Sequence, residues 1–273
     1  MSGLQQSHDA DTTAPVLSLR LPLTVNAYNQ WSLNDMGQFY FCGESVADCL
    51  HRATADYWPL GEGLCIMLFG SPSINKSILA VASEATADRG INPNSNIILF
   101  DTVNRNNDDN NATADVMGMS TLRVGSPMRA RTTDGGKVAF SFQVEVGAGS
   151  EKRKDVFSWI RGTKKDEDGL ENVVYELMRH PLKPQQHPET VNDLSSPTRY
   201  WPAHDMCNED KTIAVLSYEK HWQSSSSSLW RHMFAIQFTG EDVLREMGDD
   251  LARTILVTAA SLRVLDIIGR AGE

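Results

Sequence analysis

Residues 251–268, LARTILVTAASLRVLDII, predict a helix whose apolar side chains point in every direction. At 100° per residue, Leu251, Ile255 and Leu262 fall on one side of the helix axis. The other side is apolar as well, with Leu256, Val257, Ala260, Val264 and Ile267. A helix that rests on a sheet needs only one apolar face, so this helix must be enclosed.

Three charged residues decide what encloses the helix. Arg253, Arg263 and Asp266 lie within about 18 residues, the minimum length of a membrane-spanning segment, and each is costly at the bilayer centre. The sequence has no charge-free apolar run of that length. We therefore predict enclosure by protein and no transmembrane segment. The three charges should lie near the openings of the enclosure or pair with neighbouring side chains.

The composition is that of a globular protein that does not bind nucleic acid. The chain has 273 residues, 41% hydrophobic and 22% charged, which is enough for one large domain. A formal net charge of -10 disfavours binding to the phosphate backbone of nucleic acids. The polar start, 1–14, lacks a positively charged region followed by an apolar run, so we predict a flexible leader and no secretory signal.

The four cysteines indicate a reducing compartment. They have no C-x-x-C spacing, and a chain of this length needs no disulfides to fold. We interpret Cys42 and Cys49 as two partly buried structural thiols rather than a redox-active pair. These features predict a cytoplasmic protein and leave peripheral attachment to a membrane open.

Alternating apolar residues predict many strands before the helix. The clearest strand is 137–146 (KVAFSFQVEV). The other predicted strands are 15–23, 65–69, 77–82, 96–100, 120–124, 128–132, 155–161, 172–178, 212–218 and 231–238. Strands without intervening helices, followed by a helix too apolar for a surface, predict a mainly β fold with α. The expected architecture is a closed antiparallel β-barrel enclosing the C-terminal hydrophobic helix.

Two segments interrupt this pattern within a single predicted domain, 15–270. Segment 26–64 is rich in aromatic residues and is predicted to be irregular, apart from a short helix at 46–55 capped by Ser45. Segment 180–210 is rich in Pro, Ser, Gln and Asn, and its prolines prevent regular structure. We predict that it is a long insertion.

The order of several sequence pieces resembles the tubby C-terminal-like superfamily, in particular its fungal members. That superfamily includes plant LURP-one-related proteins and is related to scramblases. The pieces are FSFQVEVGAG (140–149), KRKDVFSWIRG (152–162), NVVYELM (172–178), IAVLSYEK (213–220), LWRHMFAIQFTG (229–240) and MGDDLARTILVTAASLRVLDIIGR (247–270). In the family, a strand that ends near a Phe-x-Trp motif precedes a strand that contains an apolar residue followed by Glu and Leu. Phe157, Trp159, Glu176 and Leu177 stand at those positions here.

The resemblance implies an antiparallel barrel around a C-terminal apolar helix. It covers roughly 15–269, and segments 26–64 and 180–210 depart from the family pattern. Tubby-like relatives bind phosphoinositide headgroups through basic barrel residues. The resemblance therefore implies an anionic phospholipid headgroup as a ligand, with a protein partner as the other expectation.

A basic cluster around the predicted strand 155–161 is the candidate ligand-binding site. Its cations are Lys152, Arg153, Lys154, Arg161, Lys164 and Lys165. A hairpin could bring the last three close to the first three. Such clusters attract anionic lipid with about 1 kcal/mol per cation. The alternative is an ordinary solvated hairpin, because Glu151, Asp155 and the acidic run 166–168 neutralise much of the charge.

Sequence patterns for catalysis or metal binding are weak. The chain has no G-x-S-x-G motif, its seven histidines are scattered, and its Gly-rich turns do not lead into a helix. His204 and Cys207 are too few to hold zinc. We predict a non-enzymatic binding or scaffold module with no catalytic residues, cofactor or metal. The alternative is an enzyme with a pocket at the barrel rim, built from segment 26–64 and His204 or Cys207.

Overall fold

The computed structural model describes residues 21–30, 37–57, 64–73, 78–84, 97–102, 122–133, 135–147, 153–165, 168–180, 211–218 and 230–267. The strands are β1 (Thr24–Gln30), β2 (Gln38–Cys42), β3 (Cys49–Tyr57), β4 (Leu64–Phe69), β5 (Ile78–Glu84), β6 (Ile97–Thr102), β7 (Leu122–Thr132), β8 (Val138–Val146), β9 (Arg153–Lys165), β10 (Glu171–His180), β11 (Lys211–Ser217) and β12 (Trp230–Phe238). A 3-10 turn, η1 (Val46–Asp48), precedes β3, and helix α1 (Glu241–Ile267) follows β12.

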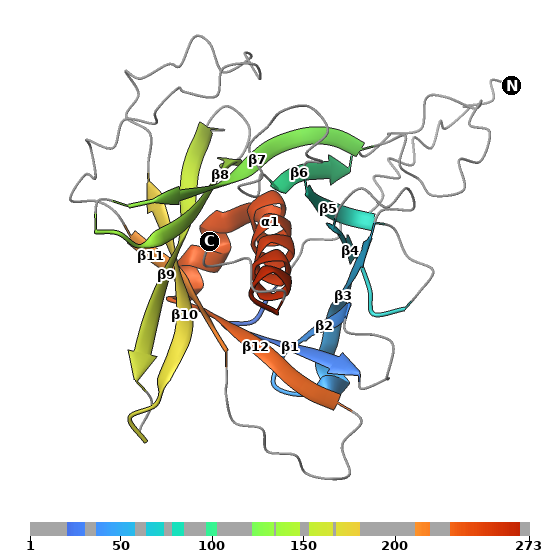
Figure 1. Ribbon diagram of the computed structural model, residues 1–273. Helices are drawn as coiled ribbons and strands as arrows, with labels where there is room; N and C mark the ends of the chain where they lie inside the picture. Colours follow the sequence, from blue (N-terminus) through green and yellow to red (C-terminus); the bar gives the residue numbers. More distant parts are fainter. Residues whose placement is uncertain are drawn as a thin grey trace, which may run out of the picture.

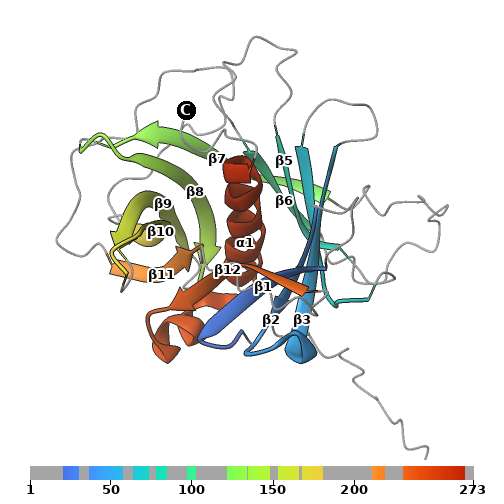
Figure 2. The same ribbon diagram turned by 60° about the horizontal axis from the view of Figure 1, so that its bottom comes forward.

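The described strands form one antiparallel sheet that surrounds α1 (Figure 1). Each strand pairs with its neighbours in chain order, and β12 pairs back with β1. Ala27 of β1, for example, is in register with Phe41 of β2 and with Phe234 of β12. Figure 2 shows α1 upright, with β1 and β12 crossing one side of it and β7 and β8 curving round another. The predicted mainly β fold with a C-terminal helix is confirmed.

Alternation along the strands places one set of side chains against α1. In β8, Phe140 and Phe142 are almost fully buried, and Phe142 stacks on Phe157 of β9 with ring centroids 5.8 Å apart. In β9 and β10, Trp159 and Leu177 are opposite each other and have no exposed surface. Burial of each large apolar side chain contributes roughly 1.5–3 kcal/mol, so this layer is a large favourable contribution to folding.

Segment 26–64 contains most of β1 and all of β2 and β3, so the prediction that it is irregular is wrong. Its aromatic residues Phe39 and Phe41 are strand residues with no exposed surface. In place of the predicted helix at 46–55, the structure has only the short turn η1. There the Ser45 hydroxyl accepts a hydrogen bond from the Ala47 N–H at 3.2 Å. Buried positions of β1 and β3 carry the polar residues Asn29, His51 and Arg52, so the apolar alternation that predicts a strand is weak there.

Other boundaries also differ from the predictions. β7 is one strand across 122–132, where two were predicted, and β9 spans 153–165 rather than 155–161. The predicted leader, 1–14, lies outside the described residues. The same holds for the Pro-rich insertion, 180–210, apart from its first residue, which ends β10.

Cys42 and Cys49 form a disulfide, which corrects the interpretation of them as separate thiols. The two residues are directly opposite each other in the β2–β3 pairing, and the turn that joins them contains η1. Sequence spacing could not reveal this contact, because it depends on the register of two strands that were not predicted. Cys65 is buried and takes no part in this disulfide, and Cys207 lies outside the described residues.

Helix α1 is enclosed over most of its length, as predicted. From Leu251 to Leu265, every residue except Arg253 and Arg263 is buried. The helix begins earlier than predicted, at Glu241, and is interrupted at Gly248, whose φ of 66° and ψ of 166° are not helical. A short first segment therefore precedes the kink, and the long apolar segment follows it.

The charged residues of the long segment are paired with neighbours, as expected. Arg253 lies 3.5 Å from the carboxylate of Asp250, and the Arg263 guanidinium stacks 4.7 Å from the centre of the Tyr218 ring. Asp266 accepts a hydrogen bond from a strand residue described below. In the part of the chain that the structure describes, no helix is long and apolar enough to cross a membrane.

One buried hydrogen bond connects the middle of α1 to the sheet. The indole Nε1–H of Trp159 donates to the hydroxyl of Thr258 at 3.0 Å, and neither residue has exposed surface. The Thr258 hydroxyl in turn donates to the Thr254 carbonyl at 2.7 Å. Thr254 has a similar hydroxyl contact with the Asp250 carbonyl, also at 2.7 Å, but no bond to the sheet.

Replacing Thr258 by valine should destabilise the protein, because the Trp159 N–H would stay buried without an acceptor. The expected loss is about 1–3 kcal/mol of unfolding free energy. Thr254→Val is the matched control: it removes a buried hydroxyl of the same helix that bonds only within the helix, and its effect should stay within about 0.5 kcal/mol. Chemical denaturation measures both. Equal losses in the two variants would contradict a special role for the bond to Trp159.

Replacing Gly248 by alanine should strain the kink, because its backbone conformation is essentially reserved for glycine. The expected cost is on the order of 1–3 kcal/mol. Gly240→Ala is the control, since neither glycine has an atom within 4 Å of an added Cβ and Gly240 does not have a positive φ. Thermal unfolding of both variants tests this, and a Gly240→Ala variant that loses as much stability would show that the backbone conformation is not the cause.

Candidate functional site

Strand β9 runs alongside α1 in the same direction, and this defines two ends of the sheet. Asp155, near the start of β9, is connected through one arginine to Glu246 before the kink. We call this the kink end. Arg161, further along β9, is opposite Tyr175, whose hydroxyl donates to Asp266 at 3.1 Å. We call this the Asp266 end.

The predicted basic cluster is divided between these two ends. Arg153 and Lys154 lie at the kink end, whereas Lys164 and Lys165 lie beyond Arg161 at the Asp266 end. Ten residues of continuous strand separate the two lysines at positions 154 and 164, roughly 33 Å along the chain. Lys152 is outside the described residues. The six cations therefore do not form one group, and ligand binding by them stays a prediction.

Two of these cations face acidic residues across the sheet. Lys154 is in register with Glu145 of β8, and Lys165 is in register with Glu171 of β10. These four side chains are all exposed, where ion pairs contribute about 0–1 kcal/mol. The strand geometry thus supports the solvated-face interpretation for these two positions.

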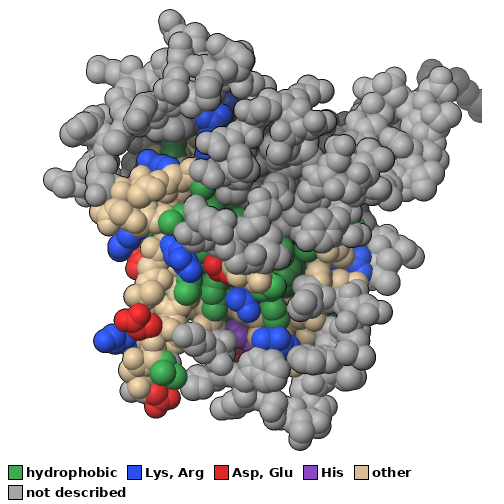
Figure 3. All heavy atoms as spheres, in the orientation of Figure 1, with side chains coloured by type: hydrophobic (Ala, Val, Ile, Leu, Met, Phe, Trp, Pro, Cys, Tyr) green, Lys and Arg blue, Asp and Glu red, His purple; other side chains and the backbone are tan. Residues whose placement is uncertain are grey.

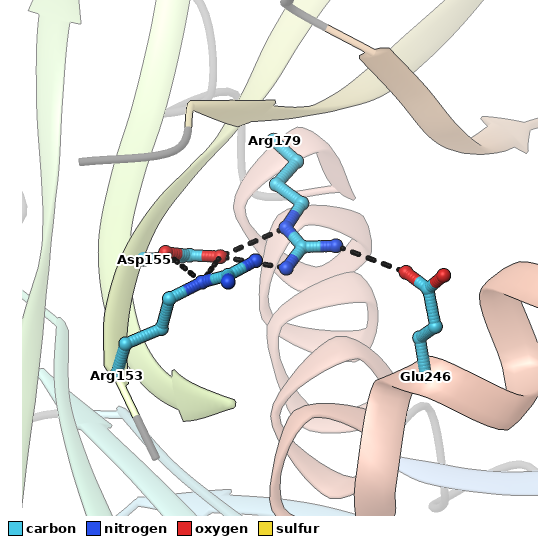
Figure 4. A network of polar contacts seen from close by, with 4 residues as sticks. All are labelled: Arg153, Asp155, Arg179 and Glu246. Atoms are coloured by element: carbon cyan, nitrogen blue, oxygen red, sulfur yellow. Dashed lines mark hydrogen bonds and ion pairs between the residues drawn. The ribbon is translucent and has the colours of Figure 1, made fainter. Parts of the chain in front are cut away.

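At the kink end, arginines surround a carboxylate with no exposed surface (Figure 4). The Arg179 Nε and a terminal nitrogen lie 2.9 Å and 2.8 Å from one Asp155 oxygen. Arg153 Nε lies 3.3 Å and 3.4 Å from the two oxygens. Arg179 also reaches Glu246 at 3.4 Å and so connects β10 to the first segment of α1. The charges at this end satisfy one another, which makes it a structural group.

At the Asp266 end, the side chains facing inward include two tyrosines. Tyr175 has no exposed surface, and its hydroxyl donates to the two Asp266 oxygens at 3.1 Å and 3.3 Å. Tyr218 follows β11, contacts the Tyr175 ring edge-on at 6.0 Å, and lies under the Arg263 guanidinium. Arg161 reaches the Tyr175 hydroxyl from β9. The site therefore combines β9, β10, the end of β11 and the last turns of α1.

Burial changes the acid–base behaviour of this group. It raises the pKa of the Tyr175 hydroxyl well above its usual range, and the charge of Asp266 raises it further. Burial and Asp266 raise the pKa of Tyr218 in the same way. Burial lowers the pKa of Arg263, against the opposing influence of Tyr218 and Asp266. Both phenols therefore remain protonated donors at neutral pH, and Arg263 stays a cation because arginine cannot lose its proton under these conditions.

Three arginines lie near the two tyrosines at this end. Arg161 acts electrostatically on Tyr175, Arg263 acts on Tyr218, and Arg231, the second residue of β12, acts on Arg263. The C-terminus of a helix carries a partial negative charge of about one half, which favours cations beside it. We call Arg161, Arg231 and Arg263 the arginine group. Figure 3 shows Lys and Arg side chains next to apolar and acidic ones on the face of the molecule seen in Figure 1.

Sequence reasoning identified only part of this site. It placed Arg161 in the ligand-binding set and recognised that Arg263 and Asp266 needed partners. It missed Tyr175, Tyr218 and Arg231, because their convergence depends on strand register. Their signal in the sequence is weak, because a tyrosine or arginine in or beside a strand is compatible with many environments.

Metal and enzyme chemistry receive no support from the described residues. No group of three or more His, Cys, Asp or Glu side chains that could hold a metal ion occurs among them. His204 and Cys207, which the alternative enzyme hypothesis requires, lie outside the described residues.

Comparison with protein-family models, curated proteins and solved structures found no match to this chain. Membership of the tubby C-terminal-like superfamily stays a prediction.

Removing the buried carboxylate at the kink end should be costly. Asp155→Asn removes the buried charge on which two arginines converge and leaves Arg179 with only the exposed Glu246, and the expected loss is about 3–5 kcal/mol of unfolding free energy. Glu246→Gln is the control, because its side chain is 70% exposed and the same arginine retains Asp155. The control should change stability by less than about 1 kcal/mol. Denaturant titration of both variants would contradict this assignment if Asp155→Asn were as stable as the control.

Proposed function

We propose that this protein is a non-enzymatic binding module that recognises an anionic phospholipid headgroup, with the tubby-like barrel as its architecture. The observation that carries the proposal is the arginine group, which gathers three cations near Tyr175 and Tyr218 at the Asp266 end. Arg161 belongs to this group, and Lys164 and Lys165 follow it by roughly 10 Å along the same strand. Half of the predicted basic residues thus lie at the end where the arginines converge.

The overall negative charge does not exclude an anionic ligand. The chain has a formal net charge of -10, but exposed charges are screened beyond about 10 Å at ordinary ionic strength. A local group of cations therefore determines attraction at short range. Asp168 and Glu171 lie next to the two lysines and offset part of their charge, so binding should be weak and sensitive to salt. The proposal implies a cytoplasmic protein that attaches peripherally to a membrane, and a protein partner is the alternative.

Vesicle co-sedimentation tests the lipid proposal. The protein is mixed with phosphatidylcholine vesicles that contain or lack a phosphoinositide, at low and at physiological salt. We expect pelleting that requires the anionic lipid and decreases at physiological salt. Absence of lipid-dependent pelleting at low salt would remove the lipid version, whereas a protein-interaction module would survive that result.

A pair of double variants tests which end binds. Lys164→Gln with Lys165→Gln should weaken vesicle binding roughly tenfold or more, at about 1 kcal/mol per lysine. Lys154→Gln with Arg245→Gln changes the net charge equally, on exposed residues at the kink end, and should have little effect. Equal losses in the two double variants would contradict binding at the Asp266 end.

A further inference from the structure

We propose that Cys42 and Cys49 form a reversible thiol–disulfide exchange site, which a small thiol of the glutathione class enters at Cys49. The structure shows the oxidised state of this pair, and the same backbone also suits the dithiol. The site is distinct from the proposed lipid site, because β2 and β3 contribute no residue to the arginine group.

The two cysteines differ in their access to solvent. Cys42 ends β2 and has no exposed surface, whereas Cys49 begins β3 and is half-buried. The turn between them, 43–48, is open to water, since its residues 44, 45, 47 and 48 are exposed. A thiol that approaches from solvent therefore meets Cys49 and not Cys42. Exchange needs access to only one of the two sulfurs.

Both sulfur atoms lie beside carbonyl groups that suit the reduced state. Cys49 Sγ is 3.1 Å from the Val46 carbonyl oxygen, and Cys42 Sγ is 3.5 Å from the Tyr40 carbonyl oxygen. A disulfide has no S–H to donate, so these contacts are hydrogen bonds only in the dithiol. After reduction, each thiol finds an acceptor in the observed backbone. The β2–β3 pairing also keeps the two cysteines opposite each other, ready to close again.

The exchange consists of two balanced steps. In the reducing direction, a glutathione thiolate attacks Cys49 Sγ, forms a mixed disulfide with it and expels Cys42 as a thiolate. A second glutathione thiolate attacks the glutathione sulfur of the mixed disulfide, expels Cys49 as a thiolate and leaves as oxidised glutathione. The two protons of the glutathione thiols pass through solvent to the two protein thiolates. In the oxidising direction, oxidised glutathione is the oxidant and the same steps run in reverse.

The proposed cytoplasmic location favours exchange over a permanent cross-link. Glutathione keeps thiols reduced in that compartment, and the disulfides that form there are usually transient. Glu44 and Asp48 are exposed in the turn and repel glutathione, which is itself an anion. We therefore expect slow exchange at low salt and faster exchange at physiological salt, where this repulsion is screened.

The turn that the pair closes is connected to the strands where the sheet returns to its beginning. The side-chain amide of Asn26, on β1, donates to the Gly43 carbonyl at 2.7 Å. The amide oxygen of Asn26 lies 3.2 Å from Nε2 of His232 on β12. Reduction gives the turn more conformational freedom and should weaken this connection between the turn, β1 and β12.

Equilibration of the folded full-length protein in glutathione buffers tests the site. The ratio of reduced to oxidised glutathione is varied, the exchange is stopped with acid, and mass spectrometry of alkylated peptides gives the state of each cysteine. We expect Cys42 and Cys49 to pass together from disulfide to dithiol as the ratio rises, and back as it falls. A disulfide that persists in excess reduced glutathione until the protein is unfolded, or one that oxidised glutathione fails to re-form, would overturn the inference.

Two serine variants test where glutathione enters. In Cys42→Ser, no second thiol displaces glutathione, so the mixed disulfide should accumulate on Cys49. Cys49→Ser leaves the buried Cys42, which should form the adduct at least about tenfold more slowly. Cys65 is 2% exposed and is the internal control, which should stay unmodified in both folded variants. Equal rates at Cys42 and Cys49, or an equally fast adduct on Cys65, would show that reaction follows unfolding and would overturn the inference.

Hydrogen exchange tests the response of the fold to reduction. We expect faster amide exchange in the turn 43–48 and in β1 of the reduced protein. Strands β8 and β9, on the other side of the sheet order, are the control and should not change. The unfolding temperature should fall by roughly 5 °C, as for the opening of a short disulfide loop. Unchanged exchange in both the turn and β1, or an equal change in every strand, would contradict the response assigned to this turn.

Discussion

The structure depends on one constraint: α1 is apolar on all sides and must be surrounded. From Leu251 to Leu265, the buried residues cover every direction around the helix axis, so a flat sheet would leave half of them in water. The sheet satisfies this constraint by pairing each strand with the next and β12 with β1. Register shifts, such as that between Ala27 and Tyr28, help strands bend round the helix, because an extra residue increases local twist.

Enclosure also limits which polar groups the helix can carry. Its hydroxyl residues donate to carbonyls one turn earlier, as Ser261 does to Val257 at 2.8 Å, and so need no partner outside the helix. Thr258 does this and also accepts from Trp159, which fixes the rotation of the helix relative to β9. If α1 slid along its axis or rotated, the indole N–H would lose its acceptor. The charged residues of the helix would also be buried against apolar side chains.

The fold was more predictable than the site, for a physical reason. Apolar periodicity is local, so the helix at 251–268 and the strand at 137–146 could be recognised from their own residues. The strands of segment 26–64 were not predicted because buried positions there carry polar residues, such as Asn29 and His51, which break the apolar alternation. The site depends on which residues of neighbouring strands meet, as Arg161 and Tyr175 do, and that is set by register and not by sequence spacing. The same applies to Cys42 and Cys49, which the β2–β3 pairing brings together.

The two ends of the sheet differ in how their arginines are paired with carboxylates. At the kink end, Asp155 receives two arginines, and Arg179 has a second carboxylate in Glu246, so each charge has a partner within the chain. At the Asp266 end, the arginine group lies near Tyr175 and Tyr218, and Asp266 accepts from Tyr175. Gathering like charges costs free energy, and the influence of Arg231 on the pKa of Arg263 is one sign of that repulsion. An anionic ligand of the kind proposed above would relieve it.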